Sequence, residues 1–127
     1  MQEARAHQDF GRAVAFSADG KLVATGTDVI LLWDTATKKI VSRFDEISSV
    51  WSLAFSPDGK TIASADKDEI VVWDANSRKK ITTIGPQAVP VYSLAFSRDG
   101  NRLFAAKRDR AVRVYTHHLM RWGQRLD

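Results

Sequence analysis

The chain contains no cysteine among its 127 residues. Disulfide bonds and thiolate-ligated metal sites are therefore excluded, and this composition fits a reducing compartment. No stretch approaches the roughly 18 consecutive apolar residues that a membrane-spanning helix requires. Residues 1–14 are polar and charged, and they lack the apolar centre of a secretory signal peptide. We therefore expect a cytoplasmic protein that has no membrane partner.

Motifs that carry catalysis or cofactor binding are also missing. No serine lies in a Gly-x-Ser-x-Gly elbow, and no glycine-rich loop is present that would hold a phosphate group. His117 and His118 are adjacent and have no evident third ligand, so they do not predict a metal site. The Asp-Gly pairs match no calcium-binding loop. We expect no catalytic residue, no cofactor and no metal, and hence a protein that is not an enzyme.

The composition is that of a globular chain, with 44% hydrophobic and 27% charged residues. The net charge of +4 is uneven, because residues 86–127 hold eight basic residues against three acidic ones. These basic residues are Arg98, Arg102, Lys107, Arg108, Arg110, Arg113, Arg121 and Arg125. They are interpreted either as an ordinary solvated surface or as a patch for nucleic acid or acidic lipid.

Two motifs recur along the chain with one common period near 40 residues. In the first, an apolar run precedes an Asp-Gly pair, and its phenylalanines, Phe16, Phe55 and Phe96, are spaced by 39 and 41 residues. In the second, an apolar run ends in an aromatic anchor. These anchors, Trp33, Trp73 and Tyr115, are spaced by 40 and 42 residues. Two separate motifs with one period indicate tandem structural repeats.

Each repeat predicts four short β-strands. The Asp-Gly pair lies between two apolar runs and indicates a hairpin, because glycine accepts the positive φ that the turn needs. The third run, as in Val29–Trp33 or Ile70–Trp73, is almost continuously apolar, as expected for a strand covered on both faces. A fourth strand is predicted at Ile40–Phe44 and at Ile81–Ile84.

These residues resemble the WD-repeat family, from about Ala6 to Tyr115. Trp33-Asp34 and Trp73-Asp74 match the dipeptide that gives the family its name. The resemblance implies an all-β fold, a partial β-propeller of about three four-stranded antiparallel blades with a short C-terminal tail. The expected array covers residues 1–127, with repeats at about 6–44, 45–85 and 86–116 and a tail at 117–127.

The resemblance also implies structural anchors that form a buried hydrogen-bond relay in each repeat. The relay joins a histidine, a hydroxyl of the second strand, an aspartate of the next turn and the tryptophan. His7 takes the histidine position of repeat one, and Asp109 takes the aspartate position before Tyr115. The other relay positions hold Glu46, Gln87, Thr25, Ser64, Ala105, Asp28 and Asp68. No repeat has the complete relay with the usual spacing, so we expect below-average rigidity.

Candidate partner-binding residues lie four positions before each anchor phenylalanine: Arg12, Trp51 and Tyr92. The resemblance implies that this position opens on the narrow face of the propeller, where many family members bind peptides. The residues before the turn aspartates should line the same rim, and these are Thr27, Lys67 and Arg108. Trp, Tyr and Arg are enriched at binding hot spots. The alternative is that Trp51 and Tyr92 pack between blades.

The Trp-Asp pattern ends after Tyr115. Leu119, Trp122 and Leu126 recur at intervals that suit a short amphipathic helix, and a strand is the alternative. Closed propellers have roughly four to eight blades. The remaining blades are therefore supplied by a longer chain or by self-association, unless the chain is a truncated remnant.

The expected function is that of a protein-protein interaction scaffold whose partners are other proteins or peptides. One alternative is a nucleic-acid-binding surface in the basic third repeat, although nucleic acid is not the expected partner. Another is the sensing part of a larger enzyme. The fold alone does not decide among them, because one fold serves many functions.

Overall fold

Three antiparallel sheets of four strands each make up the described part of the chain. The computed structural model describes residues 13–44, 49–66, 69–85, 90–118 and 121–125. Blade one consists of β1 (Ala13–Phe16), β2 (Leu22–Gly26), β3 (Ile30–Asp34) and β4 (Ile40–Phe44). Blade two consists of β5 (Ser52–Phe55), β6 (Thr61–Ala65), β7 (Ile70–Asp74) and β8 (Lys80–Ile84). Blade three consists of β9 (Val91–Phe96), β10 (Arg102–Lys107), β11 (Val112–His118) and β12 (Arg121–Arg125).

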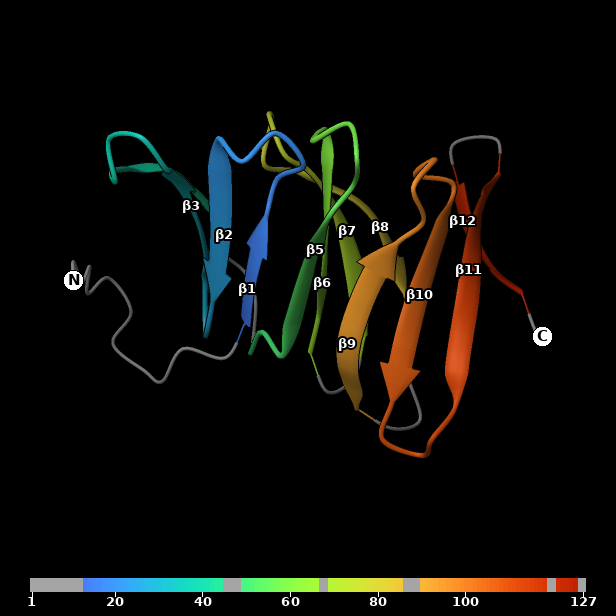
Figure 1. Cartoon of the computed structure of the whole chain (residues 1–127). Helices are drawn as coiled ribbons and strands as arrows, with labels where there is room; N and C mark the ends of the chain where they lie inside the picture. Colours follow the sequence, from blue (N-terminus) through green and yellow to red (C-terminus); the bar gives the residue numbers. More distant parts are fainter. Residues whose placement is uncertain (1–12, 45–48, 67–68, 86–89, 119–120, 126–127) are drawn as a thin grey trace.

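The blades stand side by side, with their first strands next to one another (Figure 1). β5 contacts β1 on one side and β9 on the other, and each strand within a blade pairs with its neighbour in sequence. The prediction of an all-β partial propeller with three four-stranded blades is confirmed. Across the described ranges no membrane-spanning helix is found.

The helix predicted for the tail is wrong, and the strand alternative is confirmed. β12 pairs antiparallel with β11, from Val114 opposite Arg125 to His118 opposite Arg121. This pairing satisfies backbone groups along the edge of β11 that would otherwise need water. The tail therefore completes blade three as its outer strand.

One hydrogen-bonded turn joins the first and second strands in every blade. In blade one the Ser17 hydroxyl donates to the Asp19 carboxylate at 2.7 Å, and the Lys21 N–H donates to the same oxygen at 2.9 Å. Gly20 has a φ of +73°, which glycine adopts without strain. The arrangement recurs at Ser56 with Asp58 and at Ser97 with Asp99. The Asp-Gly pairs therefore form the predicted hairpins, and together these three turns define the Asp-Gly edge of the molecule.

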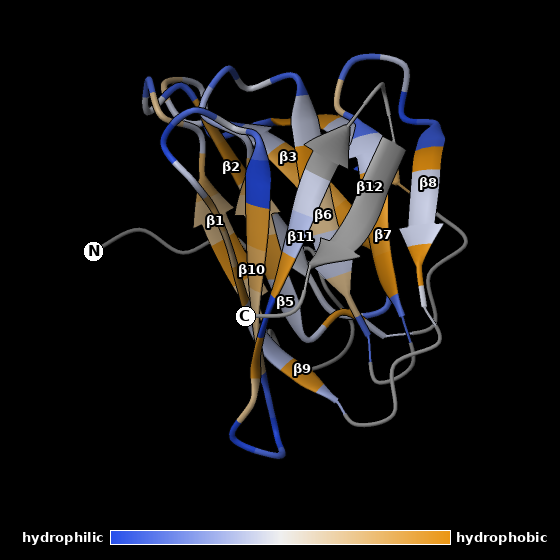
Figure 2. Ribbon diagram, turned by 90° about the vertical axis from the view of Figure 1, so that its right-hand side faces the viewer, coloured by the Kyte–Doolittle hydropathy of each residue, from blue (hydrophilic) through white to orange (hydrophobic). Residues whose placement is uncertain are grey.

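Hydrophobic residues, coloured orange, lie mainly along the strands, whereas many of the described turns are hydrophilic and coloured blue (Figure 2). Blades one and two enclose a core that includes Ala24, Ile30, Leu32, Phe44, Val50, Leu53, Phe55, Ile62, Val71 and Trp73. The Phe44 ring meets the Trp73 ring edge-on, with centroids 5.5 Å apart. Gly26 allows the close approach, because a Cβ there would lie 2.6 Å from Cγ1 of Val50. The blades are thus joined by close packing as well as by apolar area.

A second core lies between blades two and three. It includes Ala54, Ala63, Ala65, Ile70, Val91, Leu94, Leu103, Ala105 and Tyr115. Blade two therefore buries both of its faces, which explains the continuous apolar sequence of β7.

The outer faces of blades one and three stay open within the described residues. Phe16 is 65% exposed on blade one, whereas Phe55, at the same repeat position in blade two, is only 8% exposed. On blade three, Val112 is 60% exposed. The relay that the resemblance implies predicts a buried Trp33, and that prediction is wrong. Trp33 is only half-buried, because it lies in the same cross-strand row as Phe16 on the open face.

Two blades keep the tryptophan part of the expected relay. Nε1 of Trp33 donates to Oγ1 of Thr25 at 3.0 Å, and Nε1 of Trp73 donates to Oγ of Ser64 at 2.9 Å. In blade three both members are replaced, the tryptophan by Tyr115 and the hydroxyl residue by Ala105. The paired replacement avoids a buried indole N–H without an acceptor.

Replacing Trp73 with alanine is expected to lower the free energy of unfolding by about 3–5 kcal/mol, because a large buried aromatic site is emptied. Trp33→Ala is the matched control at the same repeat position. It should cost less, about 1–2 kcal/mol, because Trp33 is already partly in water. Denaturant titration of both variants measures the difference. Equal losses would contradict the placement of Trp33 on an open face.

Acid is expected to destabilise the turns of the Asp-Gly edge. The N–H of Lys21 and the hydroxyl of Ser17 hold the pKa of Asp19 below its ordinary value of 3.8. In the other two turns, the corresponding serine hydroxyl and backbone N–H lower the pKa values of Asp58 and Asp99, and the serine hydroxyl is the larger cause. The folded pKa values lie below the unfolded ones, so the carboxylates stabilise the fold at neutral pH. This contribution is lost as the pH falls below about 4 and through the folded pKa values.

Unfolding midpoints measured from neutral to acidic pH test this expectation. The triple variant Asp19→Asn, Asp58→Asn, Asp99→Asn should show a weaker dependence on acid than the parent chain. An identical acid dependence in the two proteins would show that these carboxylates contribute nothing.

The open faces predict that the isolated chain self-associates, because apolar blade surfaces of this kind are normally covered. Size-exclusion chromatography with light scattering should give a mass that rises with concentration above the monomer's 14.2 kDa. Phe16→Lys should reduce the association, and Ile81→Lys, a change on the outer strand of blade two, should not. A sharp monomer peak with a cooperative melt would refute the prediction.

Candidate functional site

The candidate site lies at the edge of the molecule opposite the Asp-Gly edge, where Trp51 and Tyr92 stack. Their ring planes are 2° apart, and their centroids are separated by 5.8 Å. Trp51 is half-buried and Tyr92 is 52% exposed. The two rings come from neighbouring blades and form one surface, which we call the aromatic edge. Neither ring is fully buried between the blades, so each keeps area for contact with another molecule.

Backbone hydrogen bonds fix Trp51 at the entry to β5. Its N–H donates to the carbonyl of Ala65 at 2.7 Å, and the N–H of Val50 donates to the carbonyl of Thr27 in blade one. Val50 is fully buried, so the segment before Trp51 is held at both the backbone and the side chain. The half-buried indole is therefore supported by a rigid connection between blades one and two.

A β-bulge positions Tyr92. Ser93 pairs with Ala106 and Val91 pairs with Lys107, so Tyr92 is the extra residue on β9. Bulges redirect a side chain relative to the regular alternation of a strand. Val91 beside it is fully buried, whereas Tyr92 is mostly exposed. The bulge thus lets β9 stay anchored in the core while the tyrosine ring contacts Trp51.

The turn between β10 and β11 lies beside this tyrosine. The N–H of Arg108 donates to the carbonyl of Pro90 at 3.0 Å, and the N–H of Arg110 donates to the carbonyl of Lys107 at 3.2 Å. Both arginine side chains are exposed. Arg108, chosen from the sequence as a rim residue, is therefore at the same edge as Tyr92. Arg110, which the sequence placed only among the basic residues of the last third of the chain, is its neighbour.

Not every candidate residue lies on this surface. Thr27 was expected on the rim but is buried, with 3% of its surface exposed. Its hydroxyl donates to the Asp28 carboxylate at 2.8 Å, and its carbonyl is covered by the segment that leads into blade two. Arg12, Lys67 and His7 lie outside the described residues.

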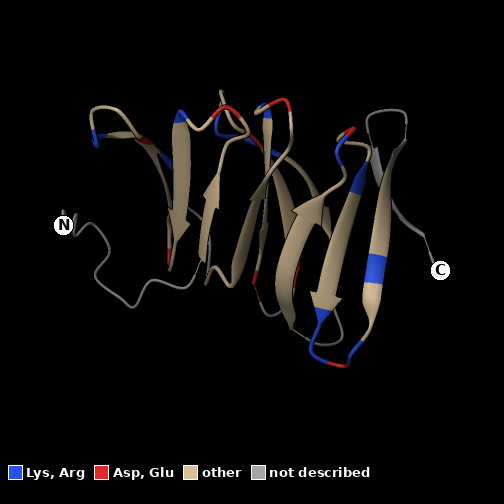
Figure 3. Cartoon of the chain, viewed as in Figure 1, with Lys and Arg blue, Asp and Glu red and all other residues tan. Residues whose placement is uncertain are grey.

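The charges at the aromatic edge differ between blades (Figure 3). Residues 66–69, between β6 and β7, read Asp-Lys-Asp-Glu, with three acidic residues against one basic. The corresponding residues 107–110 of blade three read Lys-Arg-Asp-Arg, with three basic residues against one acidic. Of the described residues, Asp66 follows Ala65, the backbone partner of Trp51, whereas Arg108 binds the segment that carries Tyr92.

The expected anchor aspartates hold turns. Asp109 accepts the N–H of Ala111 at 3.0 Å within the basic turn. Asp34 accepts two backbone N–H groups of the β3–β4 turn, and Asp74 accepts two of the β7–β8 turn. These bonds lower the pKa values of Asp34 and Asp74, with the N–H groups of Thr37 and Ser77 as the largest causes. The carboxylates are thus bound to their own backbone.

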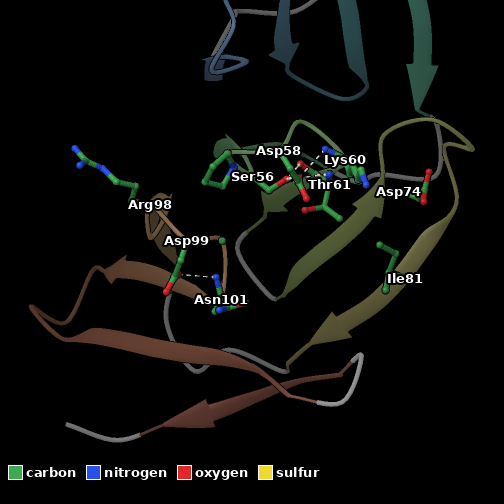
Figure 4. A pocket seen from close by; sticks show the side chains of 11 residues that line it. Ser56, Asp58, Lys60, Thr61, Asp74, Ile81, Arg98, Asp99 and Asn101 are labelled. Atoms are coloured by element: carbon green, nitrogen blue, oxygen red, sulfur yellow. Dashed lines mark hydrogen bonds between the residues drawn. The ribbon is translucent and has the colours of Figure 1, made fainter.

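A groove lies at the Asp-Gly edge, between blades two and three. It is an open groove of about 810 Å³. Asp58 and Lys60 lie on one side of it, and Asp99 and Asn101 lie on the other (Figure 4). Its charges are mixed, and Asp58 and Asp99 already accept hydrogen bonds within their turns. Sequence reasoning did not find this groove, and the only signal was the repetition of the turn in adjacent blades.

In the parts of the chain that are described, no three His, Asp or Glu side chains gather as they would around a metal ion. The aromatic edge offers stacking area and side chains of both charges. Such a surface supports recognition of another molecule by contact.

The family described as WD domain, G-beta repeat matches residues 38–74 and 78–116, together more than half of the chain. Each match starts before the outer strand of one blade and ends in the third strand of the next. The sequence repeat therefore begins one strand before the blade does.

Among curated proteins, the chain is similar to "Small ribosomal subunit protein RACK1z" of Oryza sativa subsp. japonica. The two are 37% identical over 83 residues, which is 64% of this chain and 25% of that protein. It is also 31% identical over 77 residues to "Pre-mRNA-processing factor 19" of the same organism, covering 58% of this chain and 15% of that protein. The chain thus spans a quarter or less of these relatives.

Among solved structures, the crystal structure of RRP9 WD40 repeats superimposes with a TM-score of 0.84. The match has 24% sequence identity and covers 93% of this chain and 38% of that one. This likeness concerns the fold. Because the repeat family matches over more than half of the sequence and the strands take the corresponding blade arrangement, the chain belongs to the WD-repeat family.

Proposed function

We propose that the chain is a protein-interaction module without catalytic activity, and that it binds a peptide segment of its partner at the aromatic edge. The observation that carries this proposal is the Trp51–Tyr92 stack. Two aromatic rings from different blades lie parallel at one edge, and one of them is more than half exposed. Exposed aromatic rings on a rigid support are typical of binding hot spots.

The rigidity of the support adds to this argument. The residue that precedes each ring in the sequence, Val50 or Val91, is fully buried. A surface that is already ordered loses little conformational entropy when a partner binds. The relatives named as small ribosomal subunit proteins are parts of an assembly by name, which supports a binding role and a cytoplasmic location.

The open blade faces are a second surface for contact with other molecules. Phe16 and Val112 lie on surfaces whose counterparts are covered inside the array. We propose that further blades cover them, from a longer chain or from a second copy. This covering contact is separate from peptide binding, because the aromatic edge lies at the ends of the strands and the open faces lie along them.

Selection of short random peptides displayed on phage tests the binding role. Peptides enriched by the chain should lose about tenfold or more in affinity for Tyr92→Ala, the loss expected at a hot spot, while the melting temperature stays nearly unchanged. Trp51→Ala should give the same loss of affinity. The matched control is Ile81→Ala, which removes an exposed apolar side chain from β8.

Peptides that bind Tyr92→Ala and Trp51→Ala as well as they bind the parent would refute the proposed site. Loss of stability together with binding would show that the rings serve packing alone. Circular dichroism melts of each variant separate these outcomes.

A further inference from the structure

We propose that the partner segment is an acidic peptide, with its carboxylates at Arg108 and Arg110 and an apolar or aromatic side chain against Tyr92. This inference rests on the proposed function and specifies its partner. It follows from the position of the basic turn beside the exposed ring, and from the acidic residues Asp66 and Glu69 in the neighbouring blade two.

The basic turn lies beside the exposed tyrosine ring. The β10–β11 turn is tied to the segment that carries Tyr92 by the bond from the Arg108 N–H to the Pro90 carbonyl. Lys107 pairs directly with Val91, the residue before Tyr92. The backbone that carries both arginines is therefore held beside the segment that carries the ring. Arginine binds carboxylates through two parallel hydrogen bonds, so the exposed pair suits an acidic ligand.

The ring of Tyr92 supplies the apolar part of the surface. Tyr92 lies with one side against Trp51 and has 52% of its surface exposed. A tyrosine in this setting offers apolar area at low entropic cost, and it accepts an aliphatic or aromatic side chain. A ligand with an apolar residue near acidic residues satisfies both features at once.

The charges around the stack favour a peptide over a nucleic acid, although a nucleic acid also combines negative charge with stacking. A single strand carries a phosphate at every nucleotide, and its binding grooves are positive along the whole path. Here Arg108 and Arg110 lie on the blade-three side of the stack, whereas Asp66 and Glu69 follow Ala65, the backbone partner of Trp51, in blade two. Asp28 in blade one adds another exposed acidic group at this edge. A polyanion that extends past Tyr92 is repelled, whereas a short acidic peptide segment is confined to blade three.

The charge of the selected peptides tests the inference. Random peptides selected on phage by the parent chain should be enriched in Asp and Glu next to an apolar residue. The double variant Arg108→Glu, Arg110→Glu should bind the same peptides about tenfold or more weakly, because two attractive charges become repulsive. Arg98→Glu is the matched control, since Arg98 is exposed in the same blade but at the Asp-Gly edge.

The outcomes separate this inference from the proposed function. The acidic partner would be overturned by peptides whose affinity depends on Tyr92 but that have no excess of Asp and Glu, or whose affinity is unchanged by the arginine substitutions. The binding site at Tyr92 would still be supported. Peptides that ignore Tyr92 would overturn both. Fluorescence anisotropy with an oligothymidine probe completes the test. Tighter binding of oligothymidine than of the acidic peptides, with a steep loss in salt, would replace the peptide by nucleic acid.

Discussion

The packing of one blade face against the next is the interaction on which the rest of this structure depends. A single blade of four short strands has two apolar faces and cannot cover either by itself. Blade two is stable in the middle because Trp73 and Phe55 lie against blade one, while Ala63 and Ala65 lie against blade three. The aromatic edge follows from the same contact, because its two rings belong to different blades and meet only when the blades are in register.

Local chemistry explains what the sequence predicted correctly. The hairpin turns depend on residues within a few positions of each Asp-Gly pair, so the signal is complete in the sequence. The tail was misread because three apolar residues over eight positions fit a helix as well as a strand. The distance from the aromatic anchor to the fourth strand predicts a strand in the tail. β4 starts seven residues after Trp33, β8 seven after Trp73, and β12 six after Tyr115.

Features that depend on neighbours were beyond the sequence. Trp33 and Trp73 occupy the same repeat position, yet only Trp73 has a blade on its side of the sheet. Repeat symmetry brought Trp51 and Tyr92 to one edge, but it did not indicate the bulge that exposes Tyr92. Thr27 shares its repeat position with Arg108 and is covered by a segment for which blade three has no described counterpart. The role of Trp51 and Tyr92 in binding a partner is a proposal.

The one-strand offset between the sequence unit and the blade has a consequence for how such genes change in length. The matched segments 38–74 and 78–116 each carry the last strand of one blade followed by three strands of the next. After an in-frame duplication of such a segment, the first strand of the inserted copy pairs as the outer strand of the preceding blade. The last three strands of the copy pair with the original outer strand that follows them. Every hydrogen-bonded ladder is complete after the event. Unequal recombination between repeats can therefore lengthen or shorten the array by whole blades without an unpaired strand as an intermediate.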